Sequence, residues 1–236
     1  MQVMRTRRPS PGTAARSRQA APTAAAQAIL DVAEQLVQTR GYNGISYADI
    51  AVQLGVTKAS LHYHFPSKAE LGCALIERYH ASFDAALDSI GRQESGPREK
   101  LRQYAARYQA VLNNERMCLC GMLAAEYATL PAAMKTRLTS FFDANERWLA
   151  AVLGGGLRAG VFRFDDSPNE RARLLLGALE GAMLIARSYG DPRRFGIAVE
   201  HVLADIERVD EPEASSRRAP TGARPRSAVT RRRSSG

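Results

Sequence analysis

Residues 46–65, with the sequence SYADIAVQLGVTKASLHYHF, constrain the fold more than any other stretch of the chain. They predict two short helices joined by a tight turn. Ser46 is suited to cap a helix start, and Asp49 lies three residues later, where its carboxylate can bond back to the capping residue. Apolar residues then recur at helical spacing, and Gly55 is well suited to the left-handed conformation that ends a helix. We therefore expect a first helix that begins at Ser46 and has about three turns at most.

The second helix of the pair is expected from Lys58 to Tyr63 or His64, with Thr57 as its cap and Val56 as a hydrophobic plug in the turn. One side of this helix is apolar and comprises Ala59, Leu61 and Phe65. The other side carries Lys58, Ser60, His62, Tyr63 and His64. Side chains that donate to phosphate oxygens, on a helix narrow enough for the major groove, indicate DNA binding.

At these residues the chain resembles the TetR family of repressors. The match covers GYNGISYADIAVQLGVTKASLHYHFPSKAEL, from Gly41 to Leu71. The segment before it, AILDVAEQLVQTR, corresponds to the first of the three helices of the family's DNA-binding head. The resemblance implies an all-α homodimer. In such a dimer an N-terminal three-helix helix-turn-helix head binds a palindromic double-stranded DNA operator, and a larger C-terminal helical body binds a small-molecule inducer.

The residues that we expect to contact DNA are Ser46, Tyr47, Thr57, Lys58, Ser60, His62, Tyr63, His64 and Lys68. Tyr63 occupies a position that varies in the family and often reaches bases. His62 stands where the family usually has a tyrosine, so the phosphate contact there is expected to be weaker or pH-sensitive. Ser67 is suited to cap the next helix, where free backbone amides and Lys68 together attract phosphate.

The formal net charge of the chain is +9, and its placement is uneven. Residues 1–22 contain five arginines and no acidic residue, and residues 210–236 contain seven arginines and three acidic residues. Both ends lack a hydrophobic period, which is typical of disorder. We expect a disordered basic arm at 1–22, the head at 23–67, the body at 68–209 and a disordered basic tail at 210–236. An alternative function follows from the ends: constitutive, weakly sequence-specific DNA binding driven by arginines.

Helical periodicity continues through the body. Helices are expected at about 68–90 and 98–112, before Pro131, and at about 134–154, 167–189 and 191–206. Gly154, Gly155 and Gly156 are expected to end or kink the fourth of these helices. The last two helices either pair with their copies in a dimer, as the resemblance implies, or pack within one subunit.

Aromatic and sulfur-containing side chains of the body are candidates for the inducer pocket: Tyr104, Tyr108, Cys118, Cys120, Met122, Tyr127, Phe141 and Trp148. The alternative is that each is an ordinary core residue. Cys118 and Cys120 lie about 200° apart on a helix and cannot readily bond to each other. A thiolate near Arg116 or at a helix start is expected to have a lowered pKa and to react with oxidants or electrophiles. The alternative is that both cysteines are small buried packing residues.

Other classes of protein have little support in the sequence. No segment has the roughly eighteen uninterrupted apolar residues of a membrane span, and no secretory signal precedes the head, so we expect a cytoplasmic, nucleoid-associated protein. The three cysteines are too few for a disulfide framework. The chain has no nucleophile elbow, phosphate loop or metal-binding spacing, so we expect neither catalysis nor a metal or cofactor. An enzyme that has acquired a helix-turn-helix is the third hypothesis.

Overall fold

The computed structural model describes residues 23–207, and this part of the chain is all-helical, as predicted. The basic arm predicted at 1–22 and the tail predicted at 210–236 lie outside the described residues. The head comprises α1 (Ala24–Arg40), α2 (Tyr47–Leu54) and α3 (Lys58–His64). The body comprises α4 (Lys68–Arg92), α5 (Pro97–Asn113), α6 (Leu119–Ala125), the 3-10 helix η1 (Tyr127–Thr129), α7 (Ala132–Arg158), α8 (Pro168–Ser188) and α9 (Arg193–Glu207).

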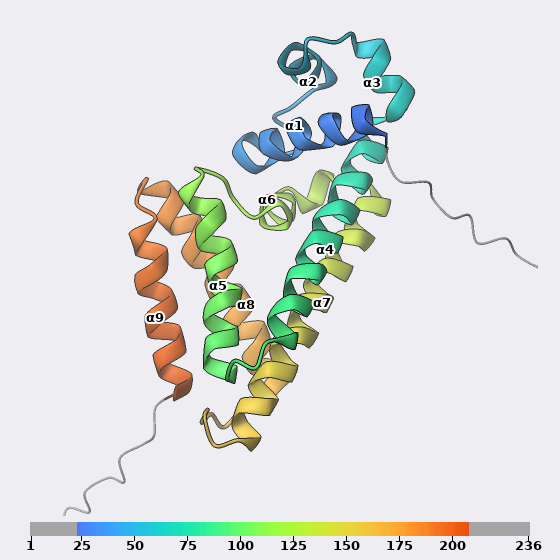
Figure 1. Cartoon of the computed structure of the whole chain (residues 1–236). Coiled ribbons are helices and arrows are strands. Elements are labelled where there is room, and N and C mark those ends of the chain that lie inside the picture. The colour runs from blue at the N-terminus through green and yellow to red at the C-terminus, as the bar shows by residue number, and fades with distance from the viewer. Residues whose placement is uncertain (1–22, 208–236) are drawn as a thin grey trace, which may run out of the picture.

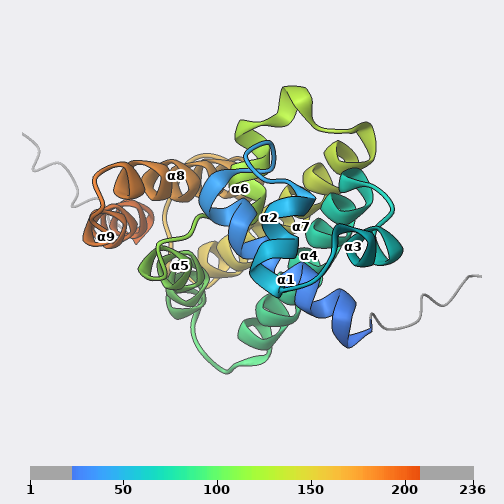
Figure 2. The same ribbon diagram turned by 90° about the horizontal axis from the view of Figure 1, so that it is seen from above.

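The head lies at one end of the longer body, with α1 between the body and the pair formed by α2 and α3 (Figure 1). Helices α4 and α7 run side by side away from the head, and α8 packs against both α7 and α9. Seen from above, α1 crosses over the body while α8 and α9 form one outer edge of the molecule (Figure 2). The apolar core is continuous from the head into the body. Between residues 23 and 207, every helix is too short or too polar to cross a bilayer.

The helices of the head begin and end at the residues that the sequence predicts. The backbone N–H of Ser46 donates to Oδ2 of Asp49 over 2.7 Å, and the N–H of Asp49 donates to Oγ of Ser46 over 3.4 Å. Thr57 and Ser67 cap α3 and α4 by accepting from amides three residues later. Gly55 ends α2 with a φ of 67°, in the left-handed region. These bonds satisfy amides and carbonyls that a helix leaves free at its ends.

Two local predictions are wrong. Val56 is 43% exposed and does not plug the turn, which is closed instead by a bond from its N–H to the carbonyl of Ala51 over 3.1 Å. Helix α7 does not end at its three glycines, as one of the two alternatives predicted for them requires, but continues to Arg158. The glycines permit a close approach, since a Cβ at Gly156 would overlap the ring of Phe162.

Gly156→Ala is therefore expected to destabilise the protein by about 1–3 kcal/mol, because the added methyl group would displace Phe162. Gly155→Ala is the matched control, since a Cβ there meets nothing within 4 Å. Gly155→Ala is expected to stabilise the protein by about 0.5–1 kcal/mol, because alanine favours a helix more than glycine does. Urea unfolding followed by circular dichroism measures both variants. Equal unfolding midpoints would contradict the packing role of Gly156.

Candidate DNA-binding face and ligand cavity

The outward side of α3 carries most of the side chains predicted to contact DNA. Lys58, His62 and Tyr63 are exposed, Tyr63 to 85%, whereas Ser60 and His64 are half-buried. The rings of Tyr63 and His64 meet edge to face with centroids 5.1 Å apart. In Figure 1 this helix lies at the end of the head, on the far side of α1 from the body. A short exposed helix with donor side chains is suited to enter a major groove.

Tyr47 has a different position from the other predicted DNA contacts. Its side chain is buried, and its hydroxyl donates to the carbonyl of Phe65 over 2.6 Å. The Tyr47 ring lies 4.6 Å from the ring of His62, whose Nδ1 lies 3.1 Å from the carbonyl oxygen of Pro66. Burial raises the pKa of Tyr47 to about 12, so the hydroxyl keeps its proton. Tyr47 is therefore placed to hold α3 and the turn after it, and its side chain does not face outward.

Ser46, Thr57 and Lys68 lie at the starts of α2, α3 and α4. The two hydroxyls act as caps: Oγ of Ser46 donates to Asp49 over 2.6 Å, and Oγ1 of Thr57 accepts from an amide over 3.3 Å. Nζ of Lys68 lies 4.5 Å from the ring centroid of Tyr42. Desolvation lowers the pKa of Lys68, although nearby carboxylates act in the opposite direction. The first turn of α4 adds free amides and the positive end of its dipole, which favour an anion such as phosphate.

The head is bonded to the body at the C-terminal end of α1. Arg187 of α8 donates from Nη1 to the carbonyl of Gln38 over 3.0 Å and from Nη2 to that of Thr39 over 2.5 Å. Glu126, which follows α6, accepts from the backbone N–H of Tyr42 over 2.7 Å. A guanidinium suits the negative end of a helix, and a carboxylate suits the free amides beyond it. The positive charge of Arg187 therefore faces backbone carbonyls, and the negative charge of Glu126 faces a backbone amide.

A second connection joins the middle of α1 to α4. Nη1 of Arg78 lies 2.6 Å from Oδ1 of Asp31, and Nη2 lies 2.6 Å from Oε2 of Glu34. The Arg78 and Glu34 side chains are each 24% exposed, so water screens this pair less than a surface pair. Loss of Arg78 would leave the charges of both Asp31 and Glu34 poorly compensated.

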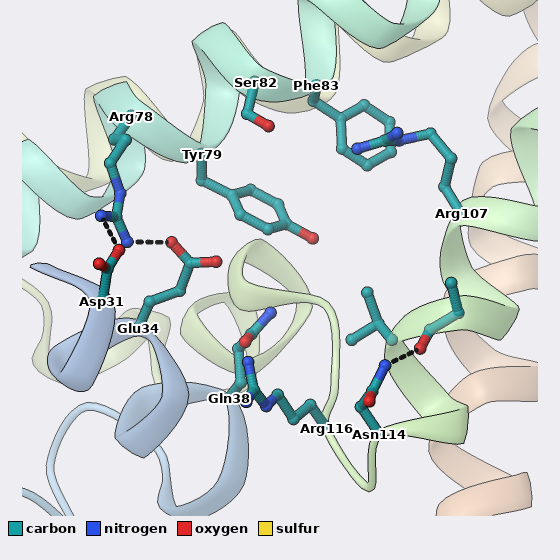
Figure 3. A pocket seen from close by; sticks show the side chains of 12 residues that line it. Asp31, Glu34, Gln38, Arg78, Tyr79, Ser82, Phe83, Arg107, Asn114 and Arg116 are labelled. Carbon is teal, nitrogen blue, oxygen red and sulfur yellow. Dashed lines mark hydrogen bonds and ion pairs between the residues drawn. The ribbon is translucent and has the colours of Figure 1, made fainter.

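A cavity of about 480 Å³ lies between α1, α4 and α5 (Figure 3). It is lined by Asp31, Glu34, Gln38, Arg78, Tyr79, Ser82, Phe83, Arg107, Ala110, Val111, Asn114 and Arg116. In Figure 3 the hydroxyl of Tyr79 points into the cavity. Two of these residues hold a buried atom without a hydrogen-bond partner in the described part of the chain, Oε1 of Gln38 and Nε of Arg107. A ligand here would contact the head and the body at the same time.

None of these lining residues is among those predicted for the inducer pocket. Tyr104, Tyr108 and Phe141 instead fill the core as a packed aromatic cluster. The hydroxyl of Tyr104 donates to Oδ1 of Asn145 over 3.0 Å, so its polar atom is already bonded inside the protein. Met122 and Trp148 line two other depressions, and Tyr127 is 47% exposed. A polar residue within a buried stripe, such as Gln38 in α1, is the signal that could have indicated the cavity.

Cys118 and Cys120 are buried, and the prediction of a lowered thiol pKa is wrong. Cys118 does lie at a helix start, where its Sγ accepts from the N–H of Gly121 over 3.4 Å. Burial nevertheless raises the pKa of both thiols well above the ordinary value, and the nearby Glu180 acts in the same direction. Desolvation therefore outweighs the helix terminus. Both side chains are buried, as the alternative of small packing residues predicts.

The described residues offer no metal site: between positions 23 and 207, no three His, Cys, Asp or Glu side chains are grouped to hold an ion.

Comparison with known proteins gives matches over both the head and the body. A family model described as "Bacterial regulatory proteins, tetR family" matches residues 29–74, and one described as "Tetracyclin repressor-like, C-terminal domain" matches residues 97–202. The HTH-type transcriptional repressor DhaR of Mycobacterium sp. (strain GP1) is 26% identical, over 67% of this chain and 80% of its own length. The HTH-type transcriptional repressor NemR of Escherichia coli (strain K12) is 27% identical, over 77% of this chain and 91% of its own. A solved TetR-family transcriptional regulator from Agrobacterium tumefaciens is 33% identical with a TM-score of 0.76, covering 80% of this chain and 100% of that one.

The carboxyl group of Glu180 on α8 predicts a pH-dependent stability. Its Oε1 is buried without a partner among residues 23–207, and burial raises its pKa from 4.5 to about 7. The folded state therefore keeps this proton over a pH range in which the unfolded chain releases it, so stability should fall as pH rises from 4.5 to about 7. Glu180→Gln cannot ionise. At pH 8 it is expected to be more stable than the wild type by about 3 kcal/mol, at about 1.4 kcal/mol per pKa unit.

Glu170→Gln is the control, because its effect on stability is expected to be opposite to that of Glu180→Gln. Glu170 lies in the same helix but accepts hydrogen bonds from Ser167, which lower its pKa. Glu170→Gln is expected to be less stable than the wild type at neutral pH. This difference in the free energy of unfolding should shrink as pH falls through the pKa of Glu170 in the folded state. Urea unfolding of the three proteins between pH 4 and pH 8 measures both effects. The account of Glu180 fails if Glu180→Gln follows the wild type at every pH.

Proposed function

This chain belongs to the TetR family of bacterial regulatory proteins and is a DNA-binding transcriptional repressor, and we propose that it acts as a homodimer on a palindromic operator until a small molecule releases it. Its relatives DhaR and NemR are HTH-type transcriptional repressors. The exposed outward side of α3 carries this proposal, because it presents donor and aromatic side chains on a head that is bonded to the body. We assign residues 23–67 to the head and residues 68–209 to the body. Because its partner is bacterial DNA, we also propose a cytoplasmic, nucleoid-associated location.

Two kinds of DNA contact are proposed for the head. Tyr63 is the most exposed aromatic side chain of α3, so we assign it to base edges. We assign the phosphate backbone to Ser46, Thr57, Lys58, Ser60, His62, His64 and Lys68. Phosphate contacts position a protein on the duplex, whereas base contacts select the sequence. Tyr47 supports both sets indirectly, through its bond to the carbonyl of Phe65.

Exposed apolar side chains on α8 and α9 support the proposed homodimer. Leu184, Ile185, Tyr189 and Ile197 are each exposed by more than half, and both helices lie at one edge of the molecule (Figure 2). Scattered apolar residues are normal on a surface, but a group on adjacent helices is typical of an interface. A Cβ at Gly181 meets nothing within 4 Å, so α8 leaves room for a second helix. A two-fold dimer would place its two α3 helices in successive major grooves.

The cavity between α1, α4 and α5 is the site that we propose for the inducer. Gln38 lines it from the head, whereas Arg78 and Arg107 line it from the body. A ligand that fits only one arrangement of head and body shifts the equilibrium toward that arrangement. Release by a thiol-reactive compound has less support, because Cys118 and Cys120 are buried and their pKa values are raised.

The DNA-contact assignments can be tested on an operator recovered by genome-wide mapping of bound sites. Tyr63→Ala is expected to reduce the discrimination between this operator and a base-substituted copy by about 1 kcal/mol or more. Lys58→Ala is expected to weaken binding to both duplexes equally and to reduce the salt slope by about one. Fluorescence anisotropy at several salt concentrations measures these effects. Unchanged discrimination by Tyr63→Ala would remove its assignment to bases.

The same assay distinguishes the repressor from the alternative function, in which the arginine-rich ends drive DNA binding. A chain lacking residues 1–22 and 210–236 should still select the operator if the head reads the sequence. Loss of all DNA binding on this deletion, with equal affinity of the full chain for every duplex, would favour the alternative.

The proposed interface predicts that Ile185→Asp produces a monomer, because a buried carboxylate on each side of a two-fold axis repels its copy. Operator affinity should fall at least 100-fold, since each half-site would be bound separately. Val161→Asp is the control, because Val161 is an exposed apolar residue outside α8 and α9. Light scattering after size-exclusion chromatography gives the oligomeric state. A dimeric Ile185→Asp protein would show that the interface lies elsewhere.

A further inference from the structure

The charges in the cavity between α1, α4 and α5 are not balanced. Its two carboxylates, those of Asp31 and Glu34, both pair with Arg78. Across residues 23–207, by contrast, neither Arg107 nor Arg116 has a carboxylate oxygen within 4.0 Å. Arg107 instead lies over the Phe83 ring, with its guanidinium carbon 4.9 Å from the ring centroid. The lining therefore contains three arginines and two carboxylates, so its formal charge is +1.

Two buried polar atoms of the lining are also unpaired. Nε of Arg107 is a donor and Oε1 of Gln38 is an acceptor, and neither has a hydrogen-bond partner in the described chain. Gln38 is only 3% exposed. Leaving a buried polar group unpaired destabilises a fold. Such atoms beside a cavity therefore indicate a ligand that supplies both an acceptor and a donor.

We propose that this cavity binds a small organic acid, with its carboxylate held by Arg107, a hydroxyl or N–H group donating to Gln38, and the positive charge of Arg116 in the lining adding to the attraction. The proposal rests on the inducer site of the proposed function and specifies its ligand class. The planar guanidinium matches a carboxylate in charge and in hydrogen-bond geometry. Phe83 and Val111 supply apolar contacts for the rest of the molecule. A neutral ligand would leave the excess positive charge of the lining uncompensated, and a cation would be repelled.

Gln38 also explains how the acid acts on the head. Its backbone carbonyl accepts from Arg187 over 3.0 Å and from the N–H of Met117 over 3.1 Å. Its side chain faces the cavity, so the bond to the ligand and the bonds to the body meet at one residue in the last turn of α1. The acid therefore changes the position of α1 relative to α8, and with it the position of α3.

Isothermal titration calorimetry of the full-length protein with 4-hydroxybenzoate tests the ligand class. Its matched probes are 4-hydroxybenzamide, which is neutral, 4-hydroxybenzylamine, which is a cation, and inorganic phosphate, which lacks the apolar body. The acid is expected to bind at least tenfold more tightly than each of the other three. Equal binding of the amide, the amine or phosphate, or no binding of the acid, would overturn the proposal.

Variants of the cavity then locate the site. Arg107→Met is expected to weaken binding of the acid at least tenfold and Arg116→Met by a smaller factor, whereas Arg107→Lys keeps the preference for the acid over the amide. Arg92→Met is the control, since Arg92 is an exposed arginine at the end of α4, outside the cavity. Thermal unfolding without probe shows that each variant is folded. Unchanged acid binding in both methionine variants of the cavity would also overturn the proposal.

Operator binding without any probe distinguishes this proposal from the proposed function. A wild-type protein that binds the acid through Arg107 but selects no operator would contradict the repressor model and leave the acid site intact. A protein that selects its operator but does not bind the acid would support the repressor model and overturn the proposed acid site. The acid is expected to weaken operator binding of the wild type at least tenfold and to leave that of Arg107→Met unchanged.

Discussion

The C-terminal end of helix α1 is bound by two charged side chains of the body, and the placement of the whole head depends on these bonds. Arg187 donates to carbonyls in the last turn, where a helix concentrates negative charge and its carbonyls lack N–H donors within the helix. Glu126 accepts from the first amides beyond the helix. The fit is close, since a Cβ at Gly41 would lie 2.7 Å from Oε1 of Glu126. Directional bonds, in addition to apolar contact, therefore orient the head, and apolar contact alone has no such direction.

This junction also accounts for the position of the cavity. Arg78 holds the middle of α1 and Arg187 holds its end, and the polar lining of the cavity lies around them. Polar bonds at this junction can be exchanged for others in a second arrangement of the head, whereas the packed core resists large changes. Under our proposals the acid binds beside α1, and the operator binds α3 on the far side of α1 from the body. Their coupling then needs no transmission through the aromatic core of the body.

Local signals predict the head well because each one depends on residues within about one helical turn. The capping box of Ser46 and Asp49 and the left-handed Gly55 are found as predicted. The same reasoning fails at Gly156, because the effect of a glycine depends on what lies opposite, which here is Phe162. It also fails at Cys118, where the helix start favours the thiolate but burial disfavours it more strongly.

The sequence by itself determined the all-α class, the helix starts in the head and the polar side of α3, because periodicity and capping act between near neighbours in the chain. Only the tertiary structure decided that Tyr47 points inward, that Tyr104 fills the core, and that Gln38 and Arg107 meet at one cavity. Burial and the choice of partner depend on distances between helices, which no local pattern encodes. Burial in turn decides the pKa of a side chain and the free energy of leaving a polar atom unpaired, and so it decides which residues remain available to a ligand.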